Sequence, residues 1–137
     1  MILWVDDDSE LVLESFFDEL RDAGFEILPA KNPDEMWDCL IAGPIEGIIM
    51  DIMLPTGDSV DLSSSKMGIL TGLRLLEKIY AEEQYQNIPS IIFTILNDQE
   101  VQDWANDNNI PLLRKQDTLP CELLEAVEKA GMRREGA

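Results

Sequence analysis

The chain has 137 residues, the length of one domain with a full hydrophobic core. Its formal charge is −18, from 28 Asp and Glu against 10 Lys and Arg. Such an acidic surface repels phosphate backbones and anionic lipid, so we expect neither nucleic-acid nor membrane binding. The sequence has no apolar run as long as a membrane span and does not open with a signal-peptide pattern, so we expect a cytoplasmic protein.

The sequence contains no histidine. This excludes an imidazole-based catalytic triad, a His-ligated zinc site and a phosphohistidine on this chain. The two cysteines, Cys39 and Cys121, lie far apart within predicted helices, and we interpret both as reduced packing residues. Any chemistry must therefore use carboxylates, hydroxyls and lysine.

Short apolar runs alternate with helical patterns along the chain. Each run is short enough for a strand, and because none alternates with polar residues, each is typical of a strand covered on both faces. Such an alternation predicts a doubly wound α/β domain, with a parallel sheet and helices on both faces, over 1–137. The strands are predicted at 2–5, 25–28, 47–50, 90–93 and 110–113.

Apolar residues at helical spacing follow each strand, beginning with a stripe over 13–20. Asn32 is predicted to cap the second helix, whose buried face includes Ile41. A polar stretch rich in Gly, Ser and Asp then predicts a long loop before the third helix. Asn97 is predicted to cap the fourth helix. The fifth helix, striped from Leu123, completes the chain.

Polar residues stand where the predicted strands end, and ligands of such folds bind at that edge of the sheet. Carboxylates gathered there repel one another unless a cation joins them, and oxygen ligands favour a hard cation such as Mg²⁺. A carboxylate, a hydroxyl and an ammonium around that cation suit a phosphoryl group. The residues are Asp6, Asp7, Asp8, Asp51, Thr94 and Lys115.

These segments resemble the receiver domain of bacterial response regulators. The resemblance covers essentially the whole chain, in order and at the family's spacing, apart from one insertion. It implies a flavodoxin-like sheet of strand order 2-1-3-4-5. It lies in Ile2–Asp7, Ile48–Pro55, Ile91–Thr94 and Leu112–Lys115.

The resemblance implies that Asp51 is the phosphoacceptor, whose carboxylate attacks the phosphohistidine of a kinase. Asp7 and Asp51 match the direct Mg²⁺ ligands, with the backbone carbonyl of Met53 as a third. Asp6 matches the acidic neighbour that holds metal-bound water.

Thr94 and Lys115 match the catalytic hydroxyl and ammonium that contact the phosphoryl group. Leu112 stands where the family carries the aromatic residue of its switch, so the usual pairing of that residue with Thr94 is altered here. Gln116 replaces a proline, which argues against the family's cis peptide. Asp8 has no role in the family, and we interpret it as a solvated charge or a helix cap.

Gly72 matches a glycine that lies closer to the acceptor in the family, which implies a loop insertion at about 56–71. The sequence leaves open whether this insertion is a plain surface loop or a lid or partner-docking element. Met53 and Leu96 match positions that flank the path of the hydrolytic water. Both are apolar here, so we expect a slowly hydrolysed acyl phosphate.

We therefore expect a response regulator that catalyses only its own phosphorylation and dephosphorylation and is not otherwise an enzyme. Its expected partners are a sensor histidine kinase or phosphotransfer protein and, because only a helix follows Lys115, a downstream protein effector. A homodimer, and a longer parent chain, stay open. The main alternative is a pseudo-receiver that binds partners without phosphorylation. A third alternative is a Mg²⁺-dependent phosphatase with an aspartate nucleophile. It is disfavoured, because such an enzyme needs a second acid two residues after the nucleophile, where this chain has Met53.

Overall fold

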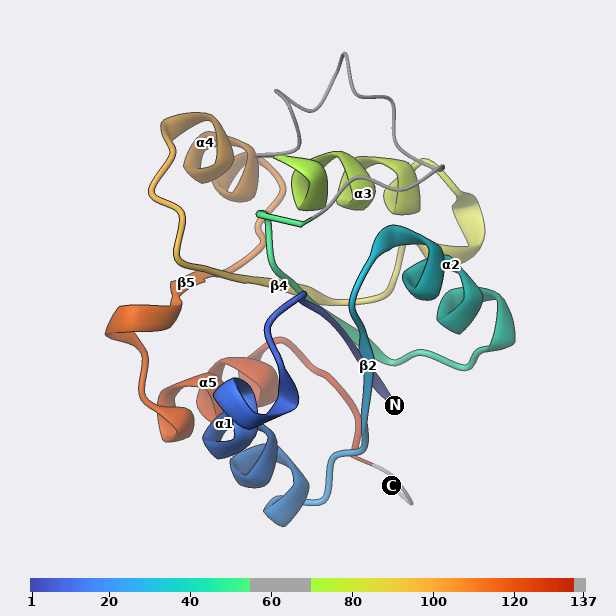
Figure 1. Ribbon diagram of the computed structural model, residues 1–137. Helices are drawn as coiled ribbons and strands as arrows, with labels where there is room; N and C mark the ends of the chain where they lie inside the picture. The colour runs from blue at the N-terminus through green and yellow to red at the C-terminus, as the bar shows by residue number, and fades with distance from the viewer. Residues whose placement is uncertain (55–69, 135–137) are drawn as a thin grey trace.

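The computed structural model describes residues 1–54 and 70–134. Its strands form one parallel sheet in the order β2-β1-β3-β4-β5 (Figure 1), so the predicted fold class and strand order are confirmed. Most of the insertion predicted at about 56–71 lies outside the described residues. The strands are β1 Ile2–Val5, β2 Ile27–Ala30, β3 Gly47–Met50, β4 Ser90–Thr94 and β5 Leu112–Arg114.

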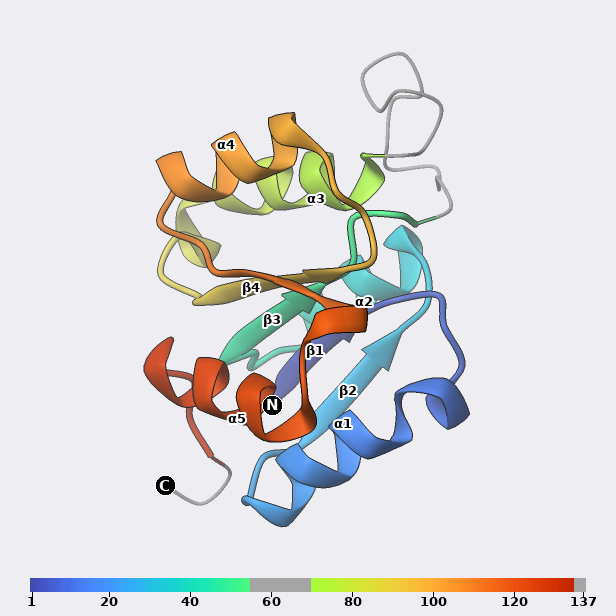
Figure 2. The same ribbon diagram turned by 90° about the vertical axis from the view of Figure 1, so that its left-hand side faces the viewer.

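Helices cover both faces of the sheet. Figures 1 and 2 show α1 and α5 on one face and α2, α3 and α4 on the other. Within the two described ranges, no helix is both long enough and apolar enough to cross a bilayer. The helices are α1 Glu10–Asp22, α2 Pro33–Ala42, α3 Thr71–Tyr80, α4 Gln99–Asp107 and α5 Pro120–Lys129, with short 3₁₀ turns η2 Glu83–Tyr85 and η3 Lys115–Asp117.

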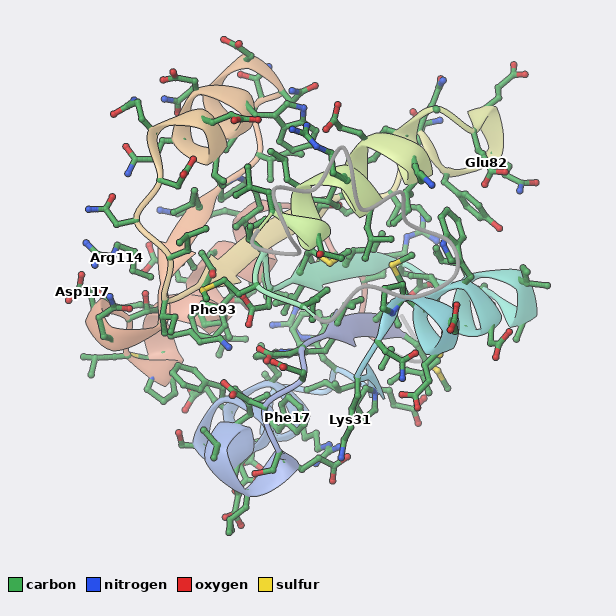
Figure 3. The ribbon with its side chains drawn as sticks, turned by 45° about the horizontal axis from the view of Figure 1, so that its top comes forward. Phe17, Lys31, Glu82, Phe93, Arg114 and Asp117 are labelled. Carbon is green, nitrogen blue, oxygen red and sulfur yellow. The ribbon has the colours of Figure 1, made fainter. Side chains whose placement is uncertain are left out.

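Each strand contributes to two hydrophobic cores, because successive side chains point to opposite faces. On the α1 and α5 face, the Trp4 ring packs edge-on against Phe17 and Phe93, with centroids 4.7 and 5.7 Å apart. Figure 3 labels Phe17 on α1 and Phe93 on β4. On the other face, Val5 and Met50 pack with apolar residues of α2, α3 and α4. Burial on both faces explains the continuous apolar runs of the strands.

The predicted start of β2 is wrong. The sequence predicts a strand from residue 25, but the Phe25 N–H donates to the Leu20 carbonyl at 3.0 Å and closes the end of α1. Gly24, at φ +99°, makes this closure possible, because a left-handed residue is the usual way for a helix to end. The strand therefore begins at Ile27.

The predicted start of β5 is also wrong, because its first residue closes the end of the preceding helix. The Ile110 N–H donates to the Ala105 carbonyl at 2.9 Å, after Asn109 at φ 56°. Ile110 therefore lies in the turn that closes the end of α4 rather than in a strand, and β5 begins at Leu112.

One of two predicted N-caps is confirmed. The Asn32 side chain accepts the Glu35 N–H at 2.9 Å and caps α2. The cap of α4 is Asp98 rather than Asn97, because Asp98 Oδ1 accepts the Val101 N–H at 3.2 Å.

Two predicted packing residues face solvent. Ile41 is 76% exposed, and Met36 takes its place on the buried face of α2. Cys39 and Cys121 are both free thiols. Cys39 packs against the core as predicted, but Cys121 is exposed. Helical spacing correctly placed Leu13, Leu20 and Leu123 on buried faces, but it placed Ile41 on the wrong side of α2.

The start of α3 lies against the backbone that follows β3. The Gly72 N–H donates to the Ile52 carbonyl at 2.9 Å. A Cβ atom at position 72 would lie only 2.0 Å from the Asp51 carbonyl oxygen and 2.7 Å from the Ile52 Cα. Because no side chain fits in that space, glycine is required for α3 to approach Asp51 this closely.

Gly72→Ala should lower the free energy of unfolding by about 3 kcal/mol, because the added methyl group meets immovable backbone. The matched control is Gly47→Ala, whose Cβ would meet the flexible side chain of Met132. It should cost only about 1 kcal/mol, since methionine can adopt another rotamer. Urea unfolding measures both, and equal losses would contradict the close approach of α3.

Candidate functional site

The polar residues that follow the strands lie together at the carboxyl edge of the sheet. Two of them extend its ladder: the Asp6 N–H donates to the Ala30 carbonyl and the Asp51 N–H to the Val5 carbonyl, both at 2.9 Å. Asp6 and Asp51 are each only 4% exposed. The group comprises Asp6, Asp7 and Asp8 after β1, Asp51 after β3, Thr94 at the end of β4 and Lys115 after β5.

The Lys115 ammonium lies between three of these carboxylates. Its Nζ is 2.7 Å from Asp6 Oδ2, 2.9 Å from Asp8 Oδ2 and 3.0 Å from Asp51 Oδ2. The lysine side chain is 11% exposed. An ammonium has three N–H donors, so each is used by one aspartate. A single cation therefore joins the ends of β1, β3 and β5.

The pKa values of this cluster reflect burial and charge. Burial raises the pKa of the Asp6 carboxyl above its ordinary value, although the hydrogen bond from Lys115 opposes the rise. Burial lowers the pKa of the Lys115 ammonium, but the hydrogen bond to Asp6 and the charge of Asp51 outweigh it and raise the pKa overall. Lys115 is therefore a permanent cation at neutral pH.

The two carboxylate oxygens of Asp51 have different partners. Oδ1 accepts the Thr94 hydroxyl at 2.8 Å and the Met53 N–H at 3.1 Å, whereas Oδ2 contacts the Lys115 ammonium. Thr94 Oγ1 also accepts the Leu96 N–H at 3.2 Å. The carboxylate is thus held by neutral donors on one side and a charge on the other, and Thr94 links it to the loop after β4.

The donor set suits a hard divalent cation. Asp6, Asp7 and Asp8 each offer a carboxylate oxygen within 4.8 Å of the others. Asp7 is exposed, and in the described part of the chain no group donates a hydrogen bond to its carboxylate. Oxygen ligands without sulfur or nitrogen fit Mg²⁺. The set expected from the sequence, Asp6, Asp7, Asp51 and the Met53 carbonyl, stays a prediction.

Asp8 is neither the solvated charge nor the helix cap that we expected from the sequence. The residue is not simply solvated, because it binds Lys115, and it does not cap α1, whose N-cap is Ser9. The Asp8 N–H donates to Asp6 Oδ1 at 2.9 Å, which turns the chain so that its carboxylate faces the ammonium. The only sequence signal was the run of consecutive aspartates after β1.

Two further expectations concern the chain on either side of Lys115: the switch role of Leu112 and the peptide bond before Gln116. Leu112 is half-buried on β5 and packs against the core under α3 and α4, so its role in a switch stays a prediction. The peptide before Gln116 is trans, since Gly43–Pro44 is the one cis bond in the described ranges. Gln116 Nε2 instead contacts the Ile95 carbonyl at 3.4 Å.

No protein-family model and no curated protein matched the sequence. Solved structures did match the fold. A CheY-like response regulator receiver domain protein from Methanospirillum hungatei is 24% identical, with a TM-score of 0.73 over 93% of this chain and 90% of that one. The BeF3-activated N-terminal receiver domain of Klebsiella pneumoniae RstA is 18% identical, with a TM-score of 0.71 over 94% and 96%.

The receiver domain of a signal transduction histidine kinase from Syntrophus aciditrophicus is 19% identical, with a TM-score of 0.71 over 99% of this chain and 96% of that one. The chain is thus a flavodoxin-like α/β domain. More narrowly, it has the CheY-like receiver-domain fold over nearly its whole length.

Lys115→Met should lower the free energy of unfolding at pH 7 by about 3–5 kcal/mol in a chelating buffer, because it leaves buried carboxylates without their cation. The cost should shrink toward pH 5. Without the ammonium, the folded-state pKa of Asp6 rises further, so the folded variant binds protons that the unfolded chain does not, and its relative stability rises as pH falls.

Urea unfolding at both pH values measures this effect. Lys129→Met is the control, because that lysine pairs with Glu125 on the open surface of α5, and its loss should cause no measurable change. A Lys115→Met protein as stable as the control at pH 7 would contradict the role of the ammonium.

Proposed function

We propose that the protein is a phosphoacceptor response regulator of two-component signal transduction. In this proposal Asp51 accepts a phosphoryl group from a sensor histidine kinase or phosphotransfer protein, in a Mg²⁺-dependent reaction that switches protein–protein interactions. The observation that carries it is the buried Asp51 carboxylate, with the Thr94 hydroxyl on one oxygen and the Lys115 ammonium on the other. The receiver-domain fold supports it.

The chemistry begins with an Asp51 oxygen attacking phosphorus. An O–P bond forms, the P–N bond to the donor imidazole breaks, and its electron pair leaves with the nitrogen. An ionised carboxylate needs no general base for this step. The Thr94 hydroxyl and the Lys115 ammonium already contact Asp51, so short movements bring both onto the phosphoryl oxygens. The protein acts only on itself.

Magnesium would be held directly by the carboxylates of Asp7 and Asp51 and by the Met53 carbonyl, with Asp6 holding a metal-bound water. When bound, it neutralises charge on the phosphoryl oxygens and orients them. Lys115 then neutralises the negative charge of the phosphoryl group on the side nearest β5. The acidic edge of the sheet thus becomes able to receive an anion.

Exposed apolar side chains near the site support contact with a partner protein. Leu11 and Val12 lie in the first turn of α1, Ile95 follows β4, and Leu119 precedes α5, and all are more than half exposed. The net charge of −18 favours a protein partner over a nucleic acid or a membrane. A downstream effector and a cytoplasmic location belong to the same proposal, and a homodimer stays open.

The direct test is the intact mass of the protein after incubation with acetyl phosphate and Mg²⁺. The wild type should gain one phosphoryl group that is lost on treatment with hydroxylamine, as an acyl phosphate is. Asp51→Asn should gain none, and chelation of the metal should abolish the gain in the wild type.

An equal gain in Asp51→Asn would contradict the assignment of the acceptor. The pseudo-receiver alternative is not favoured, because the residues matched to the hydroxyl and the lysine both contact the residue matched to the acceptor. It would be supported if the wild type gained no phosphoryl group and bound no beryllofluoride.

Met53→Asn combined with Leu96→Glu should speed loss of the phosphoryl group about tenfold or more, because polar groups beside Asp51 can orient an attacking water. Met53 is 38% exposed, and its N–H contacts Asp51, so its side chain borders the acceptor. The decay of the phosphorylated mass with time measures the rate. Met53→Leu with Leu96→Ile is the apolar control, and equal decay in the two double variants would contradict the idea.

A further inference from the structure

Asp8 occupies an N–H donor of the lysine that the phosphoryl group would need. Its Oδ2 lies 2.9 Å from Lys115 Nζ, while Asp6 and Asp51 take the other two donors. The ammonium is therefore saturated in this state. A phosphoryl oxygen can gain a charged hydrogen bond from Lys115 only when one carboxylate gives its bond up.

Exposure distinguishes the three carboxylates. The side chains of Asp6 and Asp51 are 1% and 5% exposed, whereas that of Asp8 is 42% exposed. Releasing a buried carboxylate leaves an unpaired charge without water, which is costly. Releasing Asp8 costs less, because its side chain is open enough for water to solvate the free carboxylate, although the ion pair itself is partly buried. Asp8 is thus the partner that yields.

We propose that Asp8 is a positioning residue that holds the Lys115 ammonium over Asp51 before phosphorylation and competes with the phosphoryl group for it. This inference rests on the proposed function and adds a regulatory element to the same site. The turn in which the Asp8 N–H donates to Asp6 Oδ1 at 2.9 Å keeps the competing carboxylate in place. Because this ion pair is partly open to water, the competition should change affinity by only about fivefold.

The test compares beryllofluoride binding, in the presence of Mg²⁺, to the wild type and to Asp8→Asn by titration calorimetry. Asp8→Asn should bind this phosphoryl mimic about fivefold more tightly, since one N–H of Lys115 is no longer held by a charge. Glu10→Gln is the matched control: it removes an equal charge from the first turn of α1, from a side chain without a contact to the lysine. It should change affinity less than twofold.

A second measurement in about 1 M NaCl separates direct contact from long-range repulsion, because the screening length falls to about 3 Å there. The gain of Asp8→Asn should persist, and any effect of Glu10→Gln should vanish. A gain lost in salt would overturn the inference. So would unchanged binding, or weaker binding, which would place Asp8 among the metal ligands. A wild type that binds no beryllofluoride would overturn the proposed function as well.

Discussion

The rest of the site depends on the ion pairs that the Lys115 ammonium makes with three carboxylates. The ammonium lies within 3.0 Å of carboxylates that follow both β1 and β3, and it comes from the end of β5. Parallel strands bring these residues to one edge, where burial would otherwise make the gathered negative charge unfavourable. The same lysine therefore stabilises the fold at its most acidic point and keeps a positive charge beside Asp51. Lys115 thus serves both the stability of the fold and the chemistry proposed at Asp51.

Asp51 is constrained from the other sides by neutral groups. Gly72 brings the start of α3 against its carbonyl, and Thr94 donates to its side chain while accepting the Leu96 N–H. A change in the charge of this one carboxylate would act directly on Thr94, which is linked to the loop before α4, and on Lys115. Those contacts give the proposed phosphorylation a physical route from Asp51 to the loop that precedes α4.

Much of the fold could be predicted from local patterns, because a strand buried on both faces must be continuously apolar. The strand starts of β2 and β5 could not, since Phe25 and Ile110 are apolar whether they close a helix or begin a strand. In the site, the strand-end rule brought Asp6, Asp51 and Lys115 together. The contact of Asp8 was missed because a run of consecutive aspartates does not show which carboxylates face Lys115, and the turn from the Asp8 N–H to Asp6 Oδ1 settles this only in the folded chain.

Mapping the phosphoryl group to one side chain tests the central claim most directly. Borohydride reduces an aspartyl phosphate to homoserine, and peptide mass analysis of the reduced, acetyl-phosphate-treated protein then locates the residue. The account predicts homoserine at position 51 and at no other aspartate, because Asp51 alone among the aspartates that the structure describes has both the Thr94 hydroxyl and the Lys115 ammonium beside it. Homoserine at position 6, 7 or 8, or a phosphoryl group that resists reduction on a serine or threonine, would contradict it.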